Sequence, residues 1–348
     1  KKRKCMNSHL NRDGSLLRSC LIGVVAACLV ALVCVSIGPK QAVSVFDLTL
    51  WQQFWRGEAL STDARILFQI RFPRVLLGFL VGGSLSLAGL LFQSLLQNPL
   101  ADPFIIGVSG GSALAAVLAQ TLLGLHDPLL IVLIAFGGGL AATVFVHLVA
   151  LRAGTLHRGV IILTGVVMNA FFSAAISLTL LLAGRDMPRI FAWLMGSLNL
   201  PEPTLLLPMF TLALVVMAVV FACAHPLNLL SLGDFQAYHL GLAPERMKWL
   251  VLAAASLLTS IAVSLSGMIG FIGMFVPHAV RLTLGFDHRF LIPWSFLAGA
   301  MVLAGADTLV RLAPTGEVPV GTVMAFLGAP VFLHILFHRV SRVSWQES

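Results

Sequence analysis

Residues 107–111 have the pattern Gly-x-Ser-x-Gly, which in serine hydrolases presents a nucleophilic hydroxyl on a tight turn. Such a serine needs a histidine within hydrogen-bond distance to remove its proton. His278 is the best candidate for that base, but it lies in a different apolar segment from Ser109. A rhomboid-like intramembrane serine protease is therefore kept only as an alternative.

Patterns for metal or phosphate binding are sparse. The five cysteines form no Cys-x-x-Cys pair, which argues against a thiolate metal site or a disulfide framework. His334 and His338 share one helical face, but such a pair is typical of a membrane interface, so no metal site is predicted. No lysine follows a glycine, so the chain lacks a phosphate-binding loop and is not itself a P-loop ATPase. We expect neither a cofactor nor enzymatic activity in this chain.

The composition is that of a membrane protein. Of the 348 residues, 58% are hydrophobic and 10% are charged, whereas about a quarter of the residues in soluble domains are charged. The mean hydropathy is +0.97. The net charge of +8 comes from basic residues spread between apolar runs rather than gathered on one surface, so no nucleic-acid binding is expected.

Helices of about 20 apolar residues are needed to cross a bilayer, so this length accommodates roughly ten crossings. The sequence predicts an all-α, polytopic helix bundle. The first apolar run follows a basic leader and has no small-x-small cleavage site, so we expect it to be retained. The predicted spans are residues 21–37, 75–96, 104–123, 129–151, 160–183, 205–224, 249–265, 269–284, 290–309 and 318–337.

Basic residues accumulate on the cytoplasmic side of a membrane. With the N-terminus inside, the cytoplasmic segments contain Arg152 and Arg158, Arg246 and Lys248, Arg281 and Arg289, and Arg339 and Arg342. This rule predicts a protein of the inner (plasma) membrane with both termini in the cytoplasm. Residues 1–20 are then a cytoplasmic leader, 21–339 the transmembrane domain and 340–348 a cytoplasmic tail. Residues 38–70 become external, and their Leu48, Trp51, Phe54 and Trp55 recur at the spacing of an interfacial helix.

Two groups of motifs occur in order along the chain. The first is Arg71-Phe72-Pro73-Arg74, followed by Asn98-Pro99-Leu100-Ala101-Asp102-Pro103 and by the glycine-rich run 107–111. The second includes Gly270-Phe271-Ile272-Gly273, Asp287-His288-Arg289 and Ala306-Asp307 with Arg311. Together they resemble the FecCD-type permeases of ABC importers, over about residues 71–339.

That resemblance implies an architecture like that of type II ABC importer permeases, with about ten helices. It also implies the function of a permease subunit that passes an iron-siderophore, haem or cobalamin from an external binding protein to the cytoplasm. The expected partners are two cytoplasmic ATPase subunits that bind ATP and Mg, a second permease copy, identical or related, the external binding protein and membrane lipid. The sequence does not identify the substrate.

The arginines at one end of the bundle are predicted to lie outside, where positive charge is otherwise sparse. In permeases that this chain resembles, arginines at these positions receive carboxylates from the binding protein, and a planar guanidinium suits that role. The simpler alternatives are that these arginines extend to lipid headgroups or that Arg311 pairs with Asp307, four residues earlier. The predicted docking residues are Arg71, Arg74 and Arg311.

Two further segments are predicted on the cytoplasmic side. Residues 227–245 resemble the family's coupling helices, which sit in a cleft of the ATPase, with Leu232, Gly233, Asp234, Ala237, Leu240 and Gly241 as the candidate residues. The resemblance makes Asn98, Pro99 and Leu100 part of an inner gate, although a helix-ending turn at Pro99 explains them equally well.

An ion-coupled secondary transporter is the remaining alternative. Transporters of that class usually carry ionisable groups at mid-membrane, and these spans have almost none. We therefore expect the energy for transport to come from a separate subunit.

Overall fold

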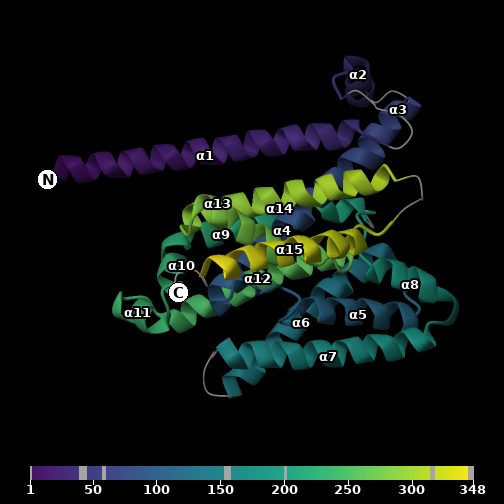
Figure 1. Cartoon of the computed structure of the whole chain (residues 1–348). Helices are drawn as coiled ribbons and strands as arrows, with labels where there is room; N and C mark the ends of the chain where they lie inside the picture. The colour runs from purple at the N-terminus through teal and green to yellow at the C-terminus, as the bar shows by residue number, and fades with distance from the viewer. Residues whose placement is uncertain are drawn as a thin grey trace.

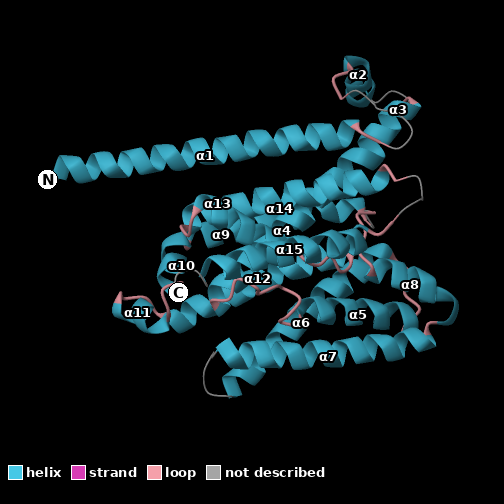
Figure 2. Ribbon diagram, in the orientation of Figure 1, coloured by secondary structure: helices cyan, strands magenta, loops and turns pink. Residues whose placement is uncertain are grey.

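The computed structural model describes residues 2–38, 45–56, 60–152, 158–199, 202–313 and 318–343, and within them it contains helices and no strand (Figure 2). Side chains of residues 2–14, 150, 158 and 332–343 are outside the description, as is the part of the predicted tail from residue 344 onward. The pair His334 and His338 therefore lies outside the described side chains. Among the described residues no group of metal-binding side chains comes together.

Ten helices correspond one to one to the ten predicted spans (Figure 1). Seven are long and apolar enough to cross a membrane, and three shorter apolar helices complete the set. The all-α architecture is thus confirmed. The helices are α1 (Lys2–Ser36), α4 (Phe72–Leu96), α5 (Val108–Leu122), α6 (Pro128–Arg152), α7 (Arg158–Leu182), α9 (Leu206–Ala222), α12 (Pro244–Ser266), α13 (Ile272–Leu284), α14 (His288–Arg311) and α15 (Val320–Val343).

Shorter helices lie between the spans. They are α2 (Leu48–Arg56), α3 (Thr62–Arg65), α8 (Met187–Leu194), α10 (Ala224–Leu230) and α11 (Asp234–His239), with single turns at Gly184–Asp186 and Pro203–Leu205. A π-helical turn, Ile66–Arg71, joins α3 to α4. The predicted helix around Trp51 is present as α2, where Trp51 and Phe54 pack against Phe68.

Helix α4 is the centre of the bundle. Its apolar window is 89% buried, compared with 17% for α7. Two glycines of α4 allow this, because a methyl group at Gly82 would overlap the Gly299 carbonyl of α14 and one at Gly89 would overlap the Gly273 carbonyl of α13. Helices in lipid associate by close packing, and small residues let their backbones approach.

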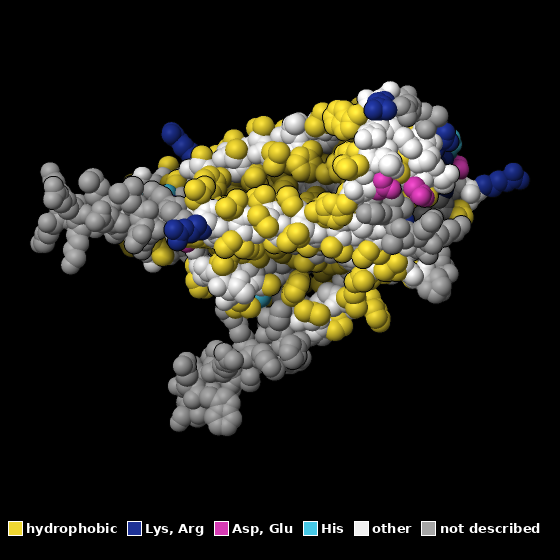
Figure 3. Space-filling view, turned by 90° about the horizontal axis from the view of Figure 1, so that it is seen from above, with side chains coloured by type: hydrophobic (Ala, Val, Ile, Leu, Met, Phe, Trp, Pro, Cys, Tyr) yellow, Lys and Arg dark blue, Asp and Glu magenta, His cyan; other side chains and the backbone are white. Residues whose placement is uncertain are grey.

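The outer surface has the pattern of a membrane-spanning body. Hydrophobic side chains cover the flank between the charged residues at the two ends (Figure 3). Leu163, Phe171 and Leu181 on α7 are more than half exposed, as is Phe326 on α15. This flank suits hydrocarbon or another apolar surface rather than water.

The backbone contact at Gly89 yields the first prediction. Replacing Gly89 with Val forces the β-carbon into the Gly273 carbonyl, and overpacking typically costs about 1–3 kcal/mol. The unfolding midpoint of purified protein in detergent should fall by several degrees, read by size-exclusion chromatography after heating.

Gly137→Ala on α6 is the matched control, because no atom outside its own turn lies within 4 Å of the added methyl group. Its midpoint should stay at the wild-type value. A Gly89→Val protein as stable as Gly137→Ala would show that α4 and α13 do not approach each other at this point.

Candidate functional site

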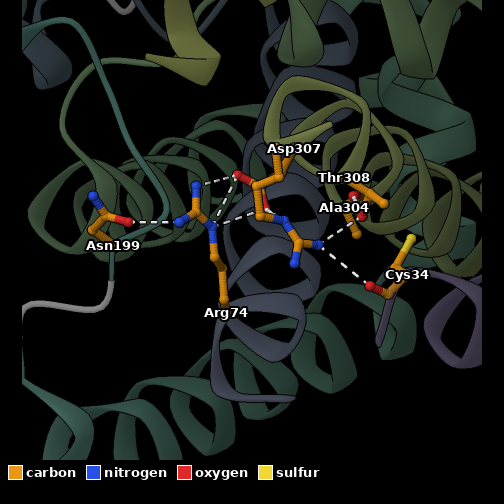
Figure 4. A network of polar contacts seen from close by, with 7 residues as sticks. Cys34, Arg74, Asn199, Ala304, Asp307 and Thr308 are labelled. Carbon is orange, nitrogen blue, oxygen red and sulfur yellow. Dashed lines mark hydrogen bonds and ion pairs between the residues drawn. The ribbon is translucent and has the colours of Figure 1, made fainter. Parts of the chain in front are cut away.

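The start of α4 and the end of α14 lie at the same end of the bundle (Figure 1). This arginine end is defined by Arg71, Arg74 and Arg311. Arg74 makes a two-pronged contact with Asp307 of α14. Its Nε donates to Oδ2 at 3.0 Å and its Nη2 donates to Oδ1 at 2.9 Å. Nη1 of Arg74 donates to Asn199 Oδ1 at 2.7 Å, which ties the segment before α9 to the same cluster (Figure 4).

Asp307 is shared by two guanidinium groups. Arg311 Nε lies 3.1 Å from Oδ2 of Asp307, and the Asp307 side chain is only 2% exposed. Arg311 Nη2 also donates to Thr308 Oγ1 at 2.8 Å and to the Cys34 carbonyl at 3.3 Å (Figure 4). The alternative that Arg311 pairs with Asp307 is confirmed, and sequence spacing did not reveal that Arg74 pairs with the same carboxylate.

Arg71 caps the end of α1. Its Nη1 donates to the carbonyls of Ser36 at 2.9 Å and of Val35 at 3.4 Å. The last carbonyls of a helix have no partner within the helix, and a cation near them is favourable. Arg71 is 4% exposed, so it is a buried capping residue here, whereas the sequence indicated an outward-facing one.

The opposite end, called the α11 end, is defined by α10 and α11. The predicted short helix is present, but it starts at Asp234 and Gly233 is its N-cap residue, with φ of 112° and no side-chain cap. Only glycine adopts that φ without strain. The Ser231 hydroxyl donates to the Leu227 carbonyl and does not cap α11.

The predicted residues of α11 divide into two groups. Ala237 is fully buried, and Asp234 forms a 2.7 Å ion pair with Lys248 of α12, so these two hold the segment on the bundle. Leu232 and Leu240 are 57% and 59% exposed. Phe235 and Tyr238, which sequence reasoning did not select, are 74% and 69% exposed and extend the same apolar surface.

Residues 97–100 form a tight turn after α4. Gln97 ends the helix in a left-handed conformation, and the Asn98 side chain accepts a hydrogen bond from the Leu100 backbone N–H at 2.9 Å. Pro99 and Leu100 are exposed. The helix-ending turn predicted from Pro99 is therefore present at the α11 end.

The protease alternative requires a hydrogen bond between Ser109 and a histidine base. Ser109 is fully buried near the start of α5, and its hydroxyl has no hydrogen-bond partner among the described residues. His278 lines a cavity of about 240 Å³ with Ser94 and Arg281, and Ser109 is not part of that lining. The part of the chain that the structure describes therefore contains no hydrogen bond from the Ser109 hydroxyl to His278.

Comparison with known proteins identifies the family to which this chain belongs. The model of the FecCD transport family matches residues 19–338. The chain belongs to the FecCD transport family. This FecCD-family chain is 40% identical to the cobalamin import system permease protein BtuC of Halobacterium salinarum, over 81% of this chain and 76% of that protein.

Two further relatives of this FecCD-family chain carry other names. The hemin transport system permease protein HmuU of Yersinia pestis is 37% identical, over 89% of this chain and 94% of that protein. The molybdate import system permease protein MolB of Haemophilus influenzae is 32% identical, over 86% and 88%. A solved metal-chelate type ABC transporter in an inward-facing conformation has a TM-score of 0.79 and 28% identity, and the match covers 92% of this chain and 99% of that one.

The shared carboxylate of this FecCD-family chain yields the second prediction. Removing one partner of a buried ion pair typically costs about 3–5 kcal/mol, because the other charge is left uncompensated. Asp307→Ala should therefore lower the unfolding midpoint strongly. Arg311→Ala should lower it less, because Arg74 still holds Asp307.

Leu309→Ala, an exposed position on the same helix, is the control and should leave the midpoint unchanged. Thermal unfolding in one detergent compares the three variants. Equal losses for Asp307→Ala and Arg311→Ala would contradict the sharing of one carboxylate by two arginines.

Proposed function

We propose that this chain is the membrane-spanning permease subunit of an ATP-driven importer for a metal chelate, of the iron-siderophore, haem or cobalamin class. The family match along residues 19–338 carries the proposal. The names of the cobalamin and hemin relatives support this substrate class, whereas a third relative is named for molybdate. In this proposal both termini and the α11 end face the cytoplasm, and the arginine end faces outward.

The exposed apolar surface of α11 is the proposed contact with the ATPase. Leu232, Phe235, Tyr238 and Leu240 are each more than half exposed beyond the end of the bundle. Large apolar side chains gathered in this way mark a protein contact, and buried aromatic residues contribute most of the energy of such contacts. ATP hydrolysis with Mg then takes place in the two partner subunits. A second permease copy covers part of the exposed flank of α7 and α15.

Asn98, Pro99 and Leu100 are the proposed inner gate. They lie at the α11 end, and Pro99 and Leu100 are exposed. In this proposal two copies of the turn, one from each permease, narrow the path at the cytoplasmic mouth. ATP-driven movement of α11 then opens it.

Uptake by reconstituted protein tests the function. Liposomes containing the permease, its ATPase and a binding protein should accumulate the chelate only when ATP is present on the side of the membrane that carries the ATPase. Uptake that continues without ATP and collapses with the ion gradient would instead establish a secondary transporter.

The double change Phe235→Ala with Tyr238→Ala should abolish both uptake and co-purification of the ATPase. Burying one such side chain contributes about 1.5–3 kcal/mol. Leu309→Ala at the arginine end, equally exposed, should retain both. ATPase retained by the double variant would contradict the proposed contact on α11.

Arg71, Arg74 and Arg311 are the proposed docking residues for the binding protein. Arg71 and Arg311 already donate to the last carbonyls of α1, and Asp307 engages Arg74 and Arg311. Incoming carboxylates must therefore exchange with these partners. We expect the double change Arg71→Glu with Arg311→Glu to weaken docking about tenfold or more, because like charges then face each other.

Surface-immobilised binding protein measures this affinity across a salt series. Wild-type affinity should fall as salt rises above about 0.15 M, where the Debye length is near 8 Å. Arg71→Gln with Arg311→Gln is the milder companion, and the unfolding midpoint of each variant verifies the fold. Equal affinities and equal salt slopes for wild type and both variants would leave the arginines with a capping role alone.

A further inference from the structure

Gln97 connects the end of α4 to the end of α10. Its Nε2 donates to the Leu230 carbonyl at 3.0 Å and to the Ser231 carbonyl at 3.3 Å. These belong to the last turn of α10, where carbonyls have no partner within the helix. Gln97 has a φ of 48°, a left-handed conformation that non-glycine residues keep only where the surroundings fix it. The next residue in the chain is Asn98, the first of the proposed gate.

Asn228 of α10 holds the start of α14. Its Oδ1 accepts the His288 backbone N–H at 2.9 Å, and its Nδ2 donates to Asp287 Oδ1 at 2.9 Å. A backbone N–H only donates and a carboxylate only accepts, so these two contacts fix which way the Asn228 amide points. Nδ1 of His288, 2.7 Å from Oδ1, must then carry a hydrogen.

The pKa of Asp287 agrees with this arrangement. Partial burial would raise it, but the hydrogen bonds from the Asn228 side chain and the Arg289 backbone, with the Arg289 charge, hold the pKa of this carboxyl below its usual value. Asp287 is also the N-cap of α14, since it accepts from the Arg289 N–H at 3.0 Å. The carboxylate therefore stays ionised at neutral pH and keeps its bond to Asn228.

His288 closes the connection back to α4. Its Nε2 lies 2.7 Å from the Ser94 hydroxyl, and both side chains are buried. The neutral ring accepts the hydroxyl hydrogen there, while a protonated ring donates to the same oxygen, which then donates to the Leu90 carbonyl at 2.9 Å. The contact is a hydrogen bond in both cases.

We propose that Gln97, Asn228 and His288 are positioning residues of one hydrogen-bonded joint, which makes α10, the start of α14 and the turn at residues 98–100 move as a unit. The joint rests on the proposed function, because it is the path by which movement of α11 reaches the gate. Displacing α10 pulls on Gln97 through two carbonyls and on α14 through Asn228.

Space for such movement lies beside the joint. A cavity of about 240 Å³ is lined by Ser94, Gln97, Pro99 and His288 among others. Packed interiors resist deformation, whereas a cavity gives the turn room to shift. The joint therefore borders both rigid helices and open volume.

Hydrogen exchange of the full chain in lipid nanodiscs tests the joint without any ATPase or binding protein. Asn228 forms its hydrogen bonds with the start of α14 rather than with the turn, yet Asn228→Ala should speed exchange of the Asn98 and Leu100 amides as well as exchange in α10. Each lost hydrogen bond should give roughly a two- to tenfold change. Gln97→Gly, which keeps the left-handed backbone, should speed exchange in α10 by a similar factor.

Ser264→Ala is the matched control, because that hydroxyl donates to the Ile261 carbonyl of its own helix. It should leave exchange at both places unchanged. If Asn228→Ala does not fold, Asn228→Ser, which is smaller and keeps one acceptor, takes its place. Faster exchange in α10 with unchanged exchange of the Asn98 and Leu100 amides would overturn the joint.

The assembled transporter gives a second readout. Asn228→Ala should keep ATP hydrolysis near the wild-type rate while the number of chelates imported per ATP falls about tenfold, a split that simple loss of fold does not produce. An unchanged ratio would overturn the mechanical role. Absence of ATP-driven uptake by the wild type would refute the importer, and the exchange experiment would still decide whether the joint exists.

Discussion

Backbone polar groups in a bilayer must be satisfied inside the protein, and this constraint determines the rest of the architecture. Each helix satisfies its backbone hydrogen bonds internally, so the helices associate by packing against each other rather than by backbone hydrogen bonds between segments. Those interfaces depend on glycine at the places where α4 meets its neighbours. Gly82 and Gly89 let the backbones of α13 and α14 approach α4 directly, and the bundle closes around that helix.

The same constraint explains where the charges lie. Desolvated charges are costly unless they are paired, and the ionisable groups described above gather at the two ends of the bundle. At the arginine end, guanidinium groups serve both Asp307 and the exposed carbonyls that finish α1. At the α11 end, side-chain amides and an imidazole link segments that are far apart in the chain. Hydrogen bonds and ion pairs therefore connect the helices at the two ends of the bundle, and apolar packing connects them between the ends.

The sequence was sufficient for the elements and insufficient for the contacts between them. Apolar run length located all ten spans, and Pro99 correctly marked the end of α4. The burial of Arg71 was not predictable, because it depends on where α1 ends in space relative to the turn before α4. An intramembrane carboxylate such as Asp307 does signal a partner, but its choice of Arg74 depends on the register between two helices.

Asn228 and Gln97 illustrate the same limit at the other end. Each is a polar residue in a short segment, where such residues are common, and only the meeting of α10 with α4 and α14 gives them specific partners. The exposure of Phe235 and Tyr238 was equally difficult to predict from the sequence. Helical periodicity predicts a face for each of them, but which face points away from the bundle depends on how α11 lies against α12.

Helix α4 reaches from one polar end to the other. Its 25 residues correspond to about 37 Å at 1.5 Å per residue, with Arg74 in the first turn and Ser94 in the last. A rod of that length acts as a lever. Tilting it by about 5° about one end displaces the other by roughly 3 Å, comparable to the small helix shifts that switch packed interfaces. A modest change of angle at the arginines is thus geometrically enough to break or form hydrogen bonds at the far end of the same helix.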